Sequence, residues 1–194
     1  MISRRRLLAL LALPLAACSP KPTTFHNTDV TGMAADTSFV LDDFSGRPQK
    51  LAEFRGKAVI LFFGYTSCPD ICPTALAKYA SLMREPGLGP EQVQVVFITL
   101  DPERDTPQRL AEYVRWFHPS FIGLTGSPAT IAEVARQMRV TAIRRDTPGS
   151  MGYVLDHTAG AYVLGPDGRL RLFLAESAPL DGIAADLRRL LAGE

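Results

Sequence analysis

Residues 58–73 read AVILFFGYTSCPDICP, and this stretch decides the fold. Its first six residues are apolar and rich in β-branched and aromatic side chains, which is typical of a strand buried on both faces of a sheet. The run ends at Gly64, and Cys68 and Cys72 follow it. Because proline suits the first turn of a helix, we expect a helix from about Pro73. The stretch therefore predicts a central strand, a cysteine loop and a helix.

The rest of the chain also alternates strands and helices. Apolar runs predict strands, and apolar residues at helical spacing predict helices, two of them opened by Thr-Pro or Ser-Pro. The expected strands or short apolar segments are 39–41, 93–100, 121–124, 161–164 and 170–174, and the expected helices are 106–117, 127–138 and 180–191. Residues 51–54 fit a short strand or a turn, and 140–152 fit an excursion or a mobile loop.

This order of elements predicts an α/β domain. Strands that alternate with helices favour a parallel sheet core. Near the end of the chain, Gly-Pro-Asp-Gly at 165–168 separates two apolar runs, which is a strong hairpin signal. We therefore expect a thioredoxin-like fold, with a mixed central sheet, flanking helices and a terminal hairpin plus helix.

The first residues have the layout of a secretory signal. Three arginines at positions 4–6 precede an apolar run that is too short to span a membrane. Residues 15–18 read LAAC and resemble a bacterial lipobox, in which Cys18 would carry a lipid. We expect a lipoprotein signal peptide at 1–17, a lipidated N-terminus with a flexible tether at 18–36, and the folded domain at 37–194. The protein would then be anchored in a bacterial cell envelope and face the periplasm or the exterior.

Length and charge exclude some classes of function. The chain without residues 1–17 is long enough for one domain with a full core. Those residues carry three of the arginines and no acidic residue, so their removal changes the formal net charge from +1 to −2. No basic surface of the kind that binds nucleic acid is expected.

The cysteine pair carries the most specific chemical signal. In an oxidising compartment, Cys68 and Cys72 form a disulfide, a redox couple or a metal site. Three residues separate them, so on a helix their Cβ atoms would lie roughly 6 Å apart, which suits two ligands of one ion. A disulfide would need Cβ atoms roughly 4 Å apart. Two soft thiolates favour copper, Cu(I) in particular, over structural zinc, which usually takes four protein ligands.

A copper site with two thiolates needs a third ligand from elsewhere. The chain has three histidines, at positions 26, 118 and 157. We expect surface roles for His26, in the tether, and for His118, at a helix end. His157 lies 85 residues beyond Cys72, so only the fold could bring them together, and on spacing alone a lone histidine is more often an ordinary surface or core residue than a ligand. Asp156 could orient the His157 ring.

Four segments of the chain resemble the Sco/SenC family of copper chaperones. The segments occur in the order that the family has, and the resemblance covers about residues 39–191. They are GYTSCPDICP at 64–73, TLDPERDTP at 99–107, GLTG at 123–126 and DHT at 156–158. Thr158 stands where the family more usually has serine.

The resemblance implies a function and a set of ligands. It implies that Cys68, Cys72 and His157 bind one copper ion per chain, as Cu(I) or Cu(II). It also implies delivery of copper to the binuclear copper A centre of cytochrome c oxidase, with subunit II as the receiving partner. A periplasmic copper chaperone and the membrane, through the lipid anchor, are the further partners that we expect.

Two other functions compete with copper delivery. The first is a thiol-disulfide oxidoreductase that uses Cys68 and Cys72 to reduce the recipient's cysteines, which some family members are thought to do. The second is a structural disulfide at the strand-to-helix junction, which would add little stability because the loop is short. Elsewhere, we expect the charged loop at 101–105 to be a solvated turn. Side chains expected to pack in the core or fill loops are Met83, Met138, Met151, Trp116, Phe117 and Phe121.

Overall fold

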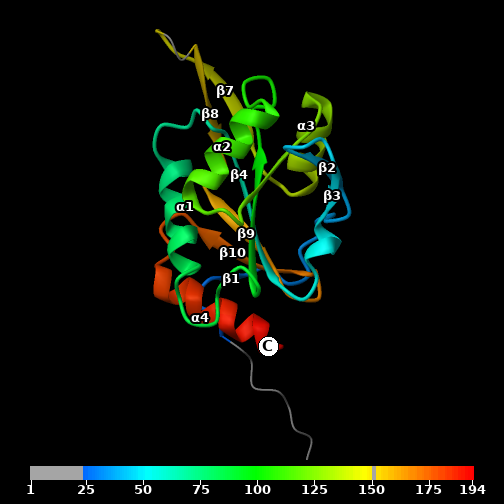
Figure 1. The fold of residues 1–194 in the computed structure, drawn as a ribbon, viewed down its shortest axis with the longest axis vertical. Coiled ribbons are helices and arrows are strands. Elements are labelled where there is room, and N and C mark those ends of the chain that lie inside the picture. Colours follow the sequence, from blue (N-terminus) through cyan, green and yellow to red (C-terminus); the bar gives the residue numbers. More distant parts are fainter. Residues whose placement is uncertain (1–23, 150–151) are drawn as a thin grey trace, which may run out of the picture.

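A computed structural model describes residues 24–149 and 152–194. The strands are β1 Thr28–Asp29, β2 Val40–Asp43, β3 Pro48–Lys50, β4 Ala58–Gly64, β5 Val93–Thr99, β6 Ile122–Thr125, β7 Ala142–Asp146, β8 Tyr153–His157, β9 Gly160–Leu164 and β10 Leu170–Ala175. The helices are α1 Ile71–Leu82, α2 Pro107–Phe117, α3 Pro128–Gln137 and α4 Leu180–Leu191, with a 3-10 turn at Leu51–Phe54. Figure 1 shows their arrangement.

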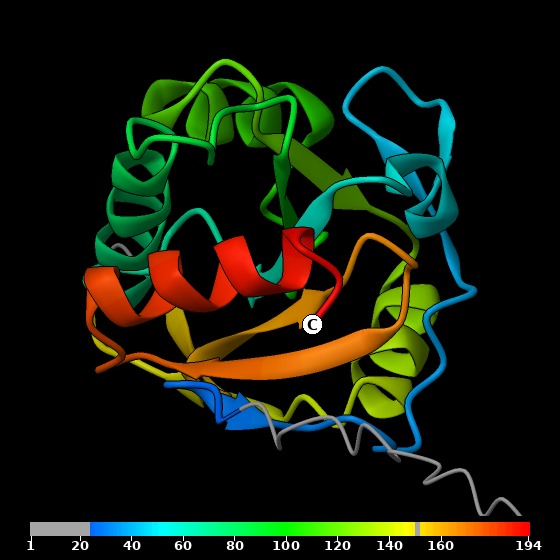
Figure 2. The ribbon, with the colours of Figure 1, turned by 90° about the horizontal axis from the view of Figure 1, so that it is seen from below.

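An eight-stranded mixed sheet forms the middle of the molecule. Its strand order is β1-β10-β9-β4-β5-β6-β2-β3, in which β4, β5 and β6 run parallel to one another. Strand β9 pairs antiparallel with both β4 and β10. Helices α1, α2 and α4 cover one face of the sheet and α3 covers the other, as the view from below shows (Figure 2). The expected α/β fold with a mixed sheet and a terminal hairpin plus helix is confirmed.

Strand β4 is central because both of its faces are apolar. Ala58, Ile60 and Phe62 point into the core beneath α1, α2 and α4. The alternate residues Val59, Leu61 and Phe63 point into the second core beneath α3. All six are at most 2 % exposed. Side chains alternate between the faces of a strand, so a continuous apolar run fills two cores at once.

The capped helices follow the sequence closely. The Thr106 hydroxyl accepts a hydrogen bond from the Arg109 backbone N–H, and the Ser127 hydroxyl does the same for Thr130. Each cap precedes a proline in the first turn. Helix α4 has the bounds predicted for it. Within residues 24–149 and 152–194, no helix has the length and apolarity that a membrane span requires.

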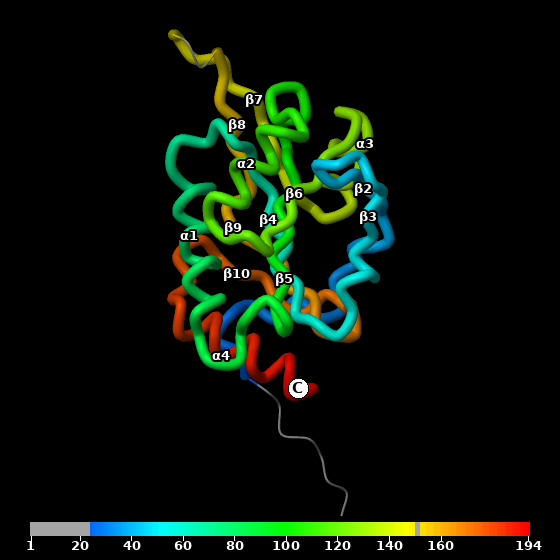
Figure 3. The backbone as a smooth tube through the Cα atoms, in the orientation of Figure 1, coloured from blue at the N-terminus to red at the C-terminus, as the bar shows by residue number. Residues whose placement is uncertain are grey.

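Residues 51–54, for which a short strand or a turn was expected, form a 3-10 turn. Two other segments differ from the expectations. The segment expected to be an excursion or a mobile loop contains β7, which pairs with β8 as a separate two-stranded ribbon. Figure 3 shows this ribbon extending beyond the end of the main sheet. Every residue of β7 is exposed, so the segment has none of the apolar alternation by which a strand is recognised.

The second difference concerns the expected tether. Thr28–Asp29 forms β1, which pairs with β10. The buried carboxylate of Asp186 in α4 accepts hydrogen bonds from the backbone N–H groups of His26 and Asn27, at 2.9 and 2.8 Å. It also accepts one from the Asn27 side chain at 2.8 Å. Residues before the expected boundary at 37 are therefore packed against the domain.

Candidate metal centre

The two cysteines lie where β4 gives way to α1. Cys68 is in the connecting loop, where its backbone N–H donates to the Tyr65 carbonyl at 3.2 Å. Helix α1 begins at Ile71, two residues before the expected start, so Cys72 lies in its first turn. The Cys72 backbone N–H points at the Cys68 Sγ, 3.5 Å away. Both cysteines are free thiols, Cys68 half-buried and Cys72 fully buried.

Gly64 leaves the space that the Cys72 sulfur occupies. A Cβ atom at position 64 would lie 2.6 Å from Cys72 Sγ and 3.0 Å from the Phe97 ring. Real Cβ atoms do not approach other atoms so closely, so any side chain at position 64 would displace the sulfur or the ring. The glycine that ends β4 is therefore a packing requirement of the site.

His157 reaches the sulfurs from the end of β8. Its Nε2 lies 3.5 Å from Cys72 Sγ. Its Nδ1 lies 3.0 Å from the Thr158 carbonyl oxygen, which can only accept, so Nδ1 donates and Nε2 is the ring nitrogen that can bind a metal ion. The rings of Phe62 and Tyr65 pack against the imidazole at centroid distances of 6.5 and 6.0 Å.

The partner of the His157 ring is a backbone carbonyl and not Asp156. The Asp156 carboxylate forms an ion pair with Arg145 across the ribbon, and its side chain is exposed. The expectation that Asp156 orients the ring is therefore wrong. Strand geometry accounts for this, because adjacent side chains of a strand point in opposite directions.

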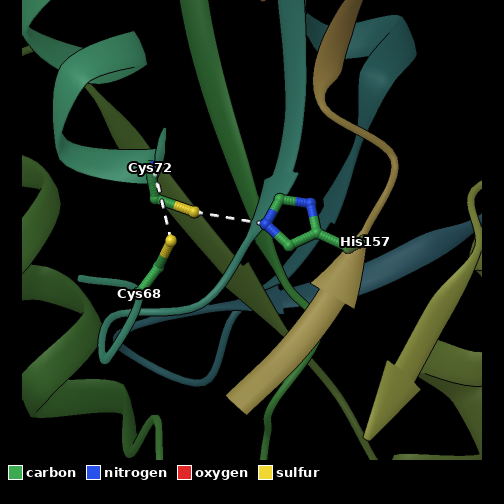
Figure 4. Close-up of side chains that lie close together, drawn as sticks. All are labelled: Cys68, Cys72 and His157. Carbon is green, nitrogen blue, oxygen red and sulfur yellow. Dashed lines mark hydrogen bonds between the residues drawn. The ribbon is translucent and has the colours of Figure 1, made fainter. Parts of the chain in front are cut away.

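The structure brings together the three residues that the sequence singled out. The Sγ atoms of Cys68 and Cys72 and a ring nitrogen of His157 all lie within 4.8 Å of one another. Figure 4 shows the two sulfurs and the imidazole converging, with Cys72 between the other two. A single ion between these atoms would have two sulfur ligands and one nitrogen ligand. That donor set suits a soft ion such as Cu(I) and is one ligand short of a structural zinc site.

The two thiols differ in acidity. Hydrogen bonds with the Cys72 side chain and, to a smaller extent, with the His157 ring lower the pKa of the Cys68 thiol to about 3. Burial of the thiol acts in the opposite direction but is outweighed. The interaction with Cys68, together with burial, raises the pKa of the Cys72 thiol far above its usual range. At neutral pH the metal-free pair therefore consists of one thiolate, at Cys68, and one thiol.

A surface cavity of ≈ 360 Å³ opens onto the site. Its walls come from the cysteine loop and from β8, and Cys68 and His157 both line it. An incoming ligand can therefore reach the Cys68 sulfur, while the Cys72 sulfur stays in the core. This arrangement suits ligand exchange at one side of a bound ion.

Asp105 accepts hydrogen bonds from the loop that carries Cys68. Its carboxylate is completely buried and accepts hydrogen bonds from the Thr66 backbone N–H at 2.9 Å, the Thr66 hydroxyl at 2.5 Å and the Thr99 hydroxyl at 2.6 Å. Asp101 is also buried, and it binds Arg104 and Tyr153. The expectation of a solvated turn at 101–105 is therefore wrong for its two aspartates. One signal could have found Asp105: the loop that carries it and the Thr66 loop follow adjacent parallel strands, whose carboxyl ends share one edge of the sheet.

The remaining candidates lie away from the sulfurs. The His118 ring bonds with the Ser120 hydroxyl at 2.8 Å, and the His26 backbone is held by Asp186. Met83 and Met138 are buried, as expected, and so is Phe121, whereas Trp116 is 86 % exposed and the expectation that it packs is wrong. Met151 and Cys18 lie outside the described residues.

Comparisons with known proteins agree with this geometry. The family model described as SCO1/SenC matches residues 28–192. The mitochondrial SCO2 homologue of Bos taurus is 43 % identical over 158 residues, which cover 79 % of this chain and 59 % of that protein. The chain therefore spans about three fifths of the length of that relative.

Two solved structures were determined with copper bound. ScoI of Arabidopsis thaliana is 34 % identical, with a TM-score of 0.74, and the match covers 83 % of this chain and 99 % of that one. ScoI of Bradyrhizobium japonicum is 39 % identical, with a TM-score of 0.70, and the match covers 78 % and 96 %. With the family model matching nearly all of the described domain, this chain belongs to the SCO1/SenC family.

Proposed function

We propose that this protein binds one copper ion through Cys68, Cys72 and His157 and delivers it to another protein. The observation that carries the proposal is the convergence of the three donor atoms within 4.8 Å, from segments 85 residues apart. The copper-bound structures of two relatives support the choice of metal. Copper is the cargo, so the site must release the ion as well as hold it.

The geometry suits a release by ligand exchange. Cys68 lines the surface cavity, so a thiol of the recipient can approach the ion beside it. His157 is carried by a ribbon that is separate from the main sheet, and its imidazole can withdraw without disturbing the core. Cys72 stays in the first turn of α1 and is the last ligand to leave. A low-coordinate soft ion can accept the new ligand before the old ones dissociate.

The recipient that we propose is the binuclear copper A centre of cytochrome c oxidase subunit II. Family membership and the thiolate-rich donor set support this choice. We further propose that a periplasmic copper chaperone loads the protein, that residues 1–17 are a signal peptide and that a lipid on Cys18 anchors the chain to a membrane of the bacterial envelope. The Leu-Ala-Ala-Cys sequence at 15–18 supports the anchor.

A copper titration of the reduced protein tests the proposed site. We expect one Cu(I) per chain in competition with a chelator, and we expect His157→Ala to lose tight binding, because the imidazole supplies one of the three donors that converge on the ion. The Cu(II) form should show a sulfur-to-copper charge-transfer band that changes in His157→Ala. His118→Ala is the matched control and should bind as the native protein does. An unchanged affinity and spectrum in His157→Ala would rule out the three-ligand site.

A thiol-disulfide reductase is the second candidate, and the unequal burial of the two thiols favours it. Cys68 is reachable from the surface cavity, whereas Cys72 is 0 % exposed. This is the arrangement of an attacking thiolate and a resolving thiol. A disulfide-reductase assay separates the two functions, because Cys68→Ser should abolish reduction while His157→Ala should leave it intact.

The pH dependence of alkylation tests the reactivity of Cys68. A pKa lowered to about 3 means that the thiolate is present at every pH above about 3. The rate with iodoacetamide should therefore change less than about twofold between pH 8 and pH 5, where an ordinary thiol slows roughly a thousandfold. Mass spectrometry of the modified peptide gives the rate. Cys72→Ala removes the side chain that donates to the Cys68 thiolate, the main cause of the low pKa, and should restore a steep pH dependence. A steep dependence in the native protein would contradict the thiolate assignment.

A further inference from the structure

The ribbon that carries His157 is not part of the main sheet. Within residues 24–149 and 152–194, β7 and β8 pair only with each other. A two-stranded ribbon is at best marginally stable by itself. Its base is fixed where the Thr158 backbone N–H donates to the Thr141 carbonyl and the Thr141 N–H donates to the Thr158 hydroxyl, both at 3.0 Å. The path of β8 beyond that base depends on other contacts with the body.

Tyr153 supplies the strongest of these contacts, at the start of β8. Its hydroxyl donates to the Asp101 carboxylate at 2.7 Å. The other oxygen of Asp101 is 2.5 Å from the Arg104 Nε, and the Arg104 Nη1 donates to the Tyr153 carbonyl at 3.0 Å. The guanidinium carbon of Arg104 also lies 3.5 Å from the centre of the Tyr153 ring. The Asp101–Arg104 ion pair, which is buried on the Asp101 side, thus contacts the hydroxyl, the ring and the carbonyl of Tyr153.

The side chain of Tyr153 points toward the same side of β8 as that of His157. Residues 153, 155 and 157 share one face of the strand, because side chains alternate. Between them, the Leu155 backbone N–H donates to the Tyr65 hydroxyl at 3.2 Å. The Tyr65 ring in turn packs edge-on against the His157 imidazole. The contacts at Tyr153 and Leu155 therefore determine where the His157 ring stands.

From these contacts we infer that Tyr153 is a positioning residue, whose hydroxyl on Asp101 holds β8 against the body and so keeps the His157 imidazole over the two sulfurs. The inference rests on the proposed metal site. Without the hydroxyl, Asp101 loses a partner in a buried position and β8 samples outward orientations. The copper affinity then falls in proportion to the fraction of molecules in which His157 faces the sulfurs.

A double-mutant cycle of copper affinity tests the inference. Tyr153→Phe keeps the ring over Arg104 and removes only the hydroxyl, so the fold should persist. We expect its Cu(I) affinity to fall by between about twofold and tenfold, the range for one lost hydrogen bond. In a His157→Ala background the same change should have no further effect, because the imidazole it positions is gone. An equal loss in both backgrounds, or no loss in the native background, would overturn the inference.

A measurement without copper separates this inference from the proposed function. In the reduced, metal-free protein, hydrogen exchange of the Leu155 amide should be faster in Tyr153→Phe than in the native protein. Tyr162→Phe is the matched control, because it removes the hydroxyl of a tyrosine in β9 whose ring packs on Phe173 of β10. It should leave that exchange rate unchanged. Unchanged exchange in Tyr153→Phe would refute the positioning role even if copper binding is confirmed. Should His157→Ala bind copper normally, the proposed ligand set fails, and the exchange result still decides whether Tyr153 holds β8.

Discussion

Serine in place of Cys72 is expected to abolish tight copper binding. Cys72 Sγ lies between the other two donors, 3.5 Å from the His157 Nε2 and beside the Cys68 sulfur. A serine hydroxyl is a hard donor that stays protonated at neutral pH, so it does not replace a thiolate on Cu(I). We expect the Cu(I) affinity to fall by more than roughly 100-fold, beyond the range that changes outside the ligand set usually cause. Chelator competition on the reduced protein measures it.

A control separates lost ligation from lost folding. Ala75 lies in the same helix and is 8 % exposed, so Ala75→Ser adds a comparable hydroxyl to α1 without removing a sulfur. Both variants should unfold at similar urea concentrations in the metal-free state, and only Cys72→Ser should lose copper. Native-like affinity in Cys72→Ser would show that the buried sulfur is not a ligand.

Alanine in place of Asp105 is expected to lower the stability of the fold strongly. The Asp105 carboxylate is 0 % exposed and accepts hydrogen bonds from three donors on Thr66 and Thr99. Its removal leaves buried donors without an acceptor and opens a cavity beneath the cysteine loop. We expect the free energy of unfolding to fall by about 3 kcal/mol. The melting temperature should fall by roughly 6 to 12 °C for a domain of this size.

Urea unfolding of the metal-free protein measures this effect. Asp36 is the matched control, because its exposed carboxylate accepts similar hydrogen bonds from the Ser38 backbone N–H and hydroxyl. Asp36→Ala should change the free energy of unfolding by less than about 0.5 kcal/mol. If the two variants lost the same small amount, the Asp105 network would be of no structural importance.

The sequence predicts most of the main sheet and its helices because their signals are local. The apolar run of β4 and the capped starts of α2 and α3 lie within single segments of the chain. Strand β7 could not be found in this way, since it is exposed along its whole length and, in the part of the chain that the structure describes, pairs with β8 alone. For Trp116 the error is the reverse, because it was expected to pack and is exposed. An aromatic residue next to the buried face of a helix does not have to lie on that face.

The candidate site was only partly predictable, for a similar reason. The spacing of Cys68 and Cys72 at a strand-to-helix junction indicates a pair of ligands, whereas spacing alone leaves the role of His157 open. The burial of Asp101 and Asp105 depends on Thr66, Thr99 and Tyr153, which come from three other parts of the chain. Asp186 is a missed residue of the same kind. Its position within the apolar stripe of α4, beside Ile183 and Leu187, was the signal of a buried carboxylate.

The hydrogen bonds between Asp186 and the backbone of residues 26 and 27 also bear on how the protein would be oriented at a bilayer. They fix the point where the chain leaves the domain, next to α4, at the opposite end of the molecule from the ribbon (Figure 1). Six residue steps separate Cys18 from Thr24, a reach of at most about 20 Å. With a lipid at Cys18, the α4 end would face the headgroups and the copper would be displayed toward the aqueous phase. In that orientation an acceptor would receive the ion well above the lipid surface.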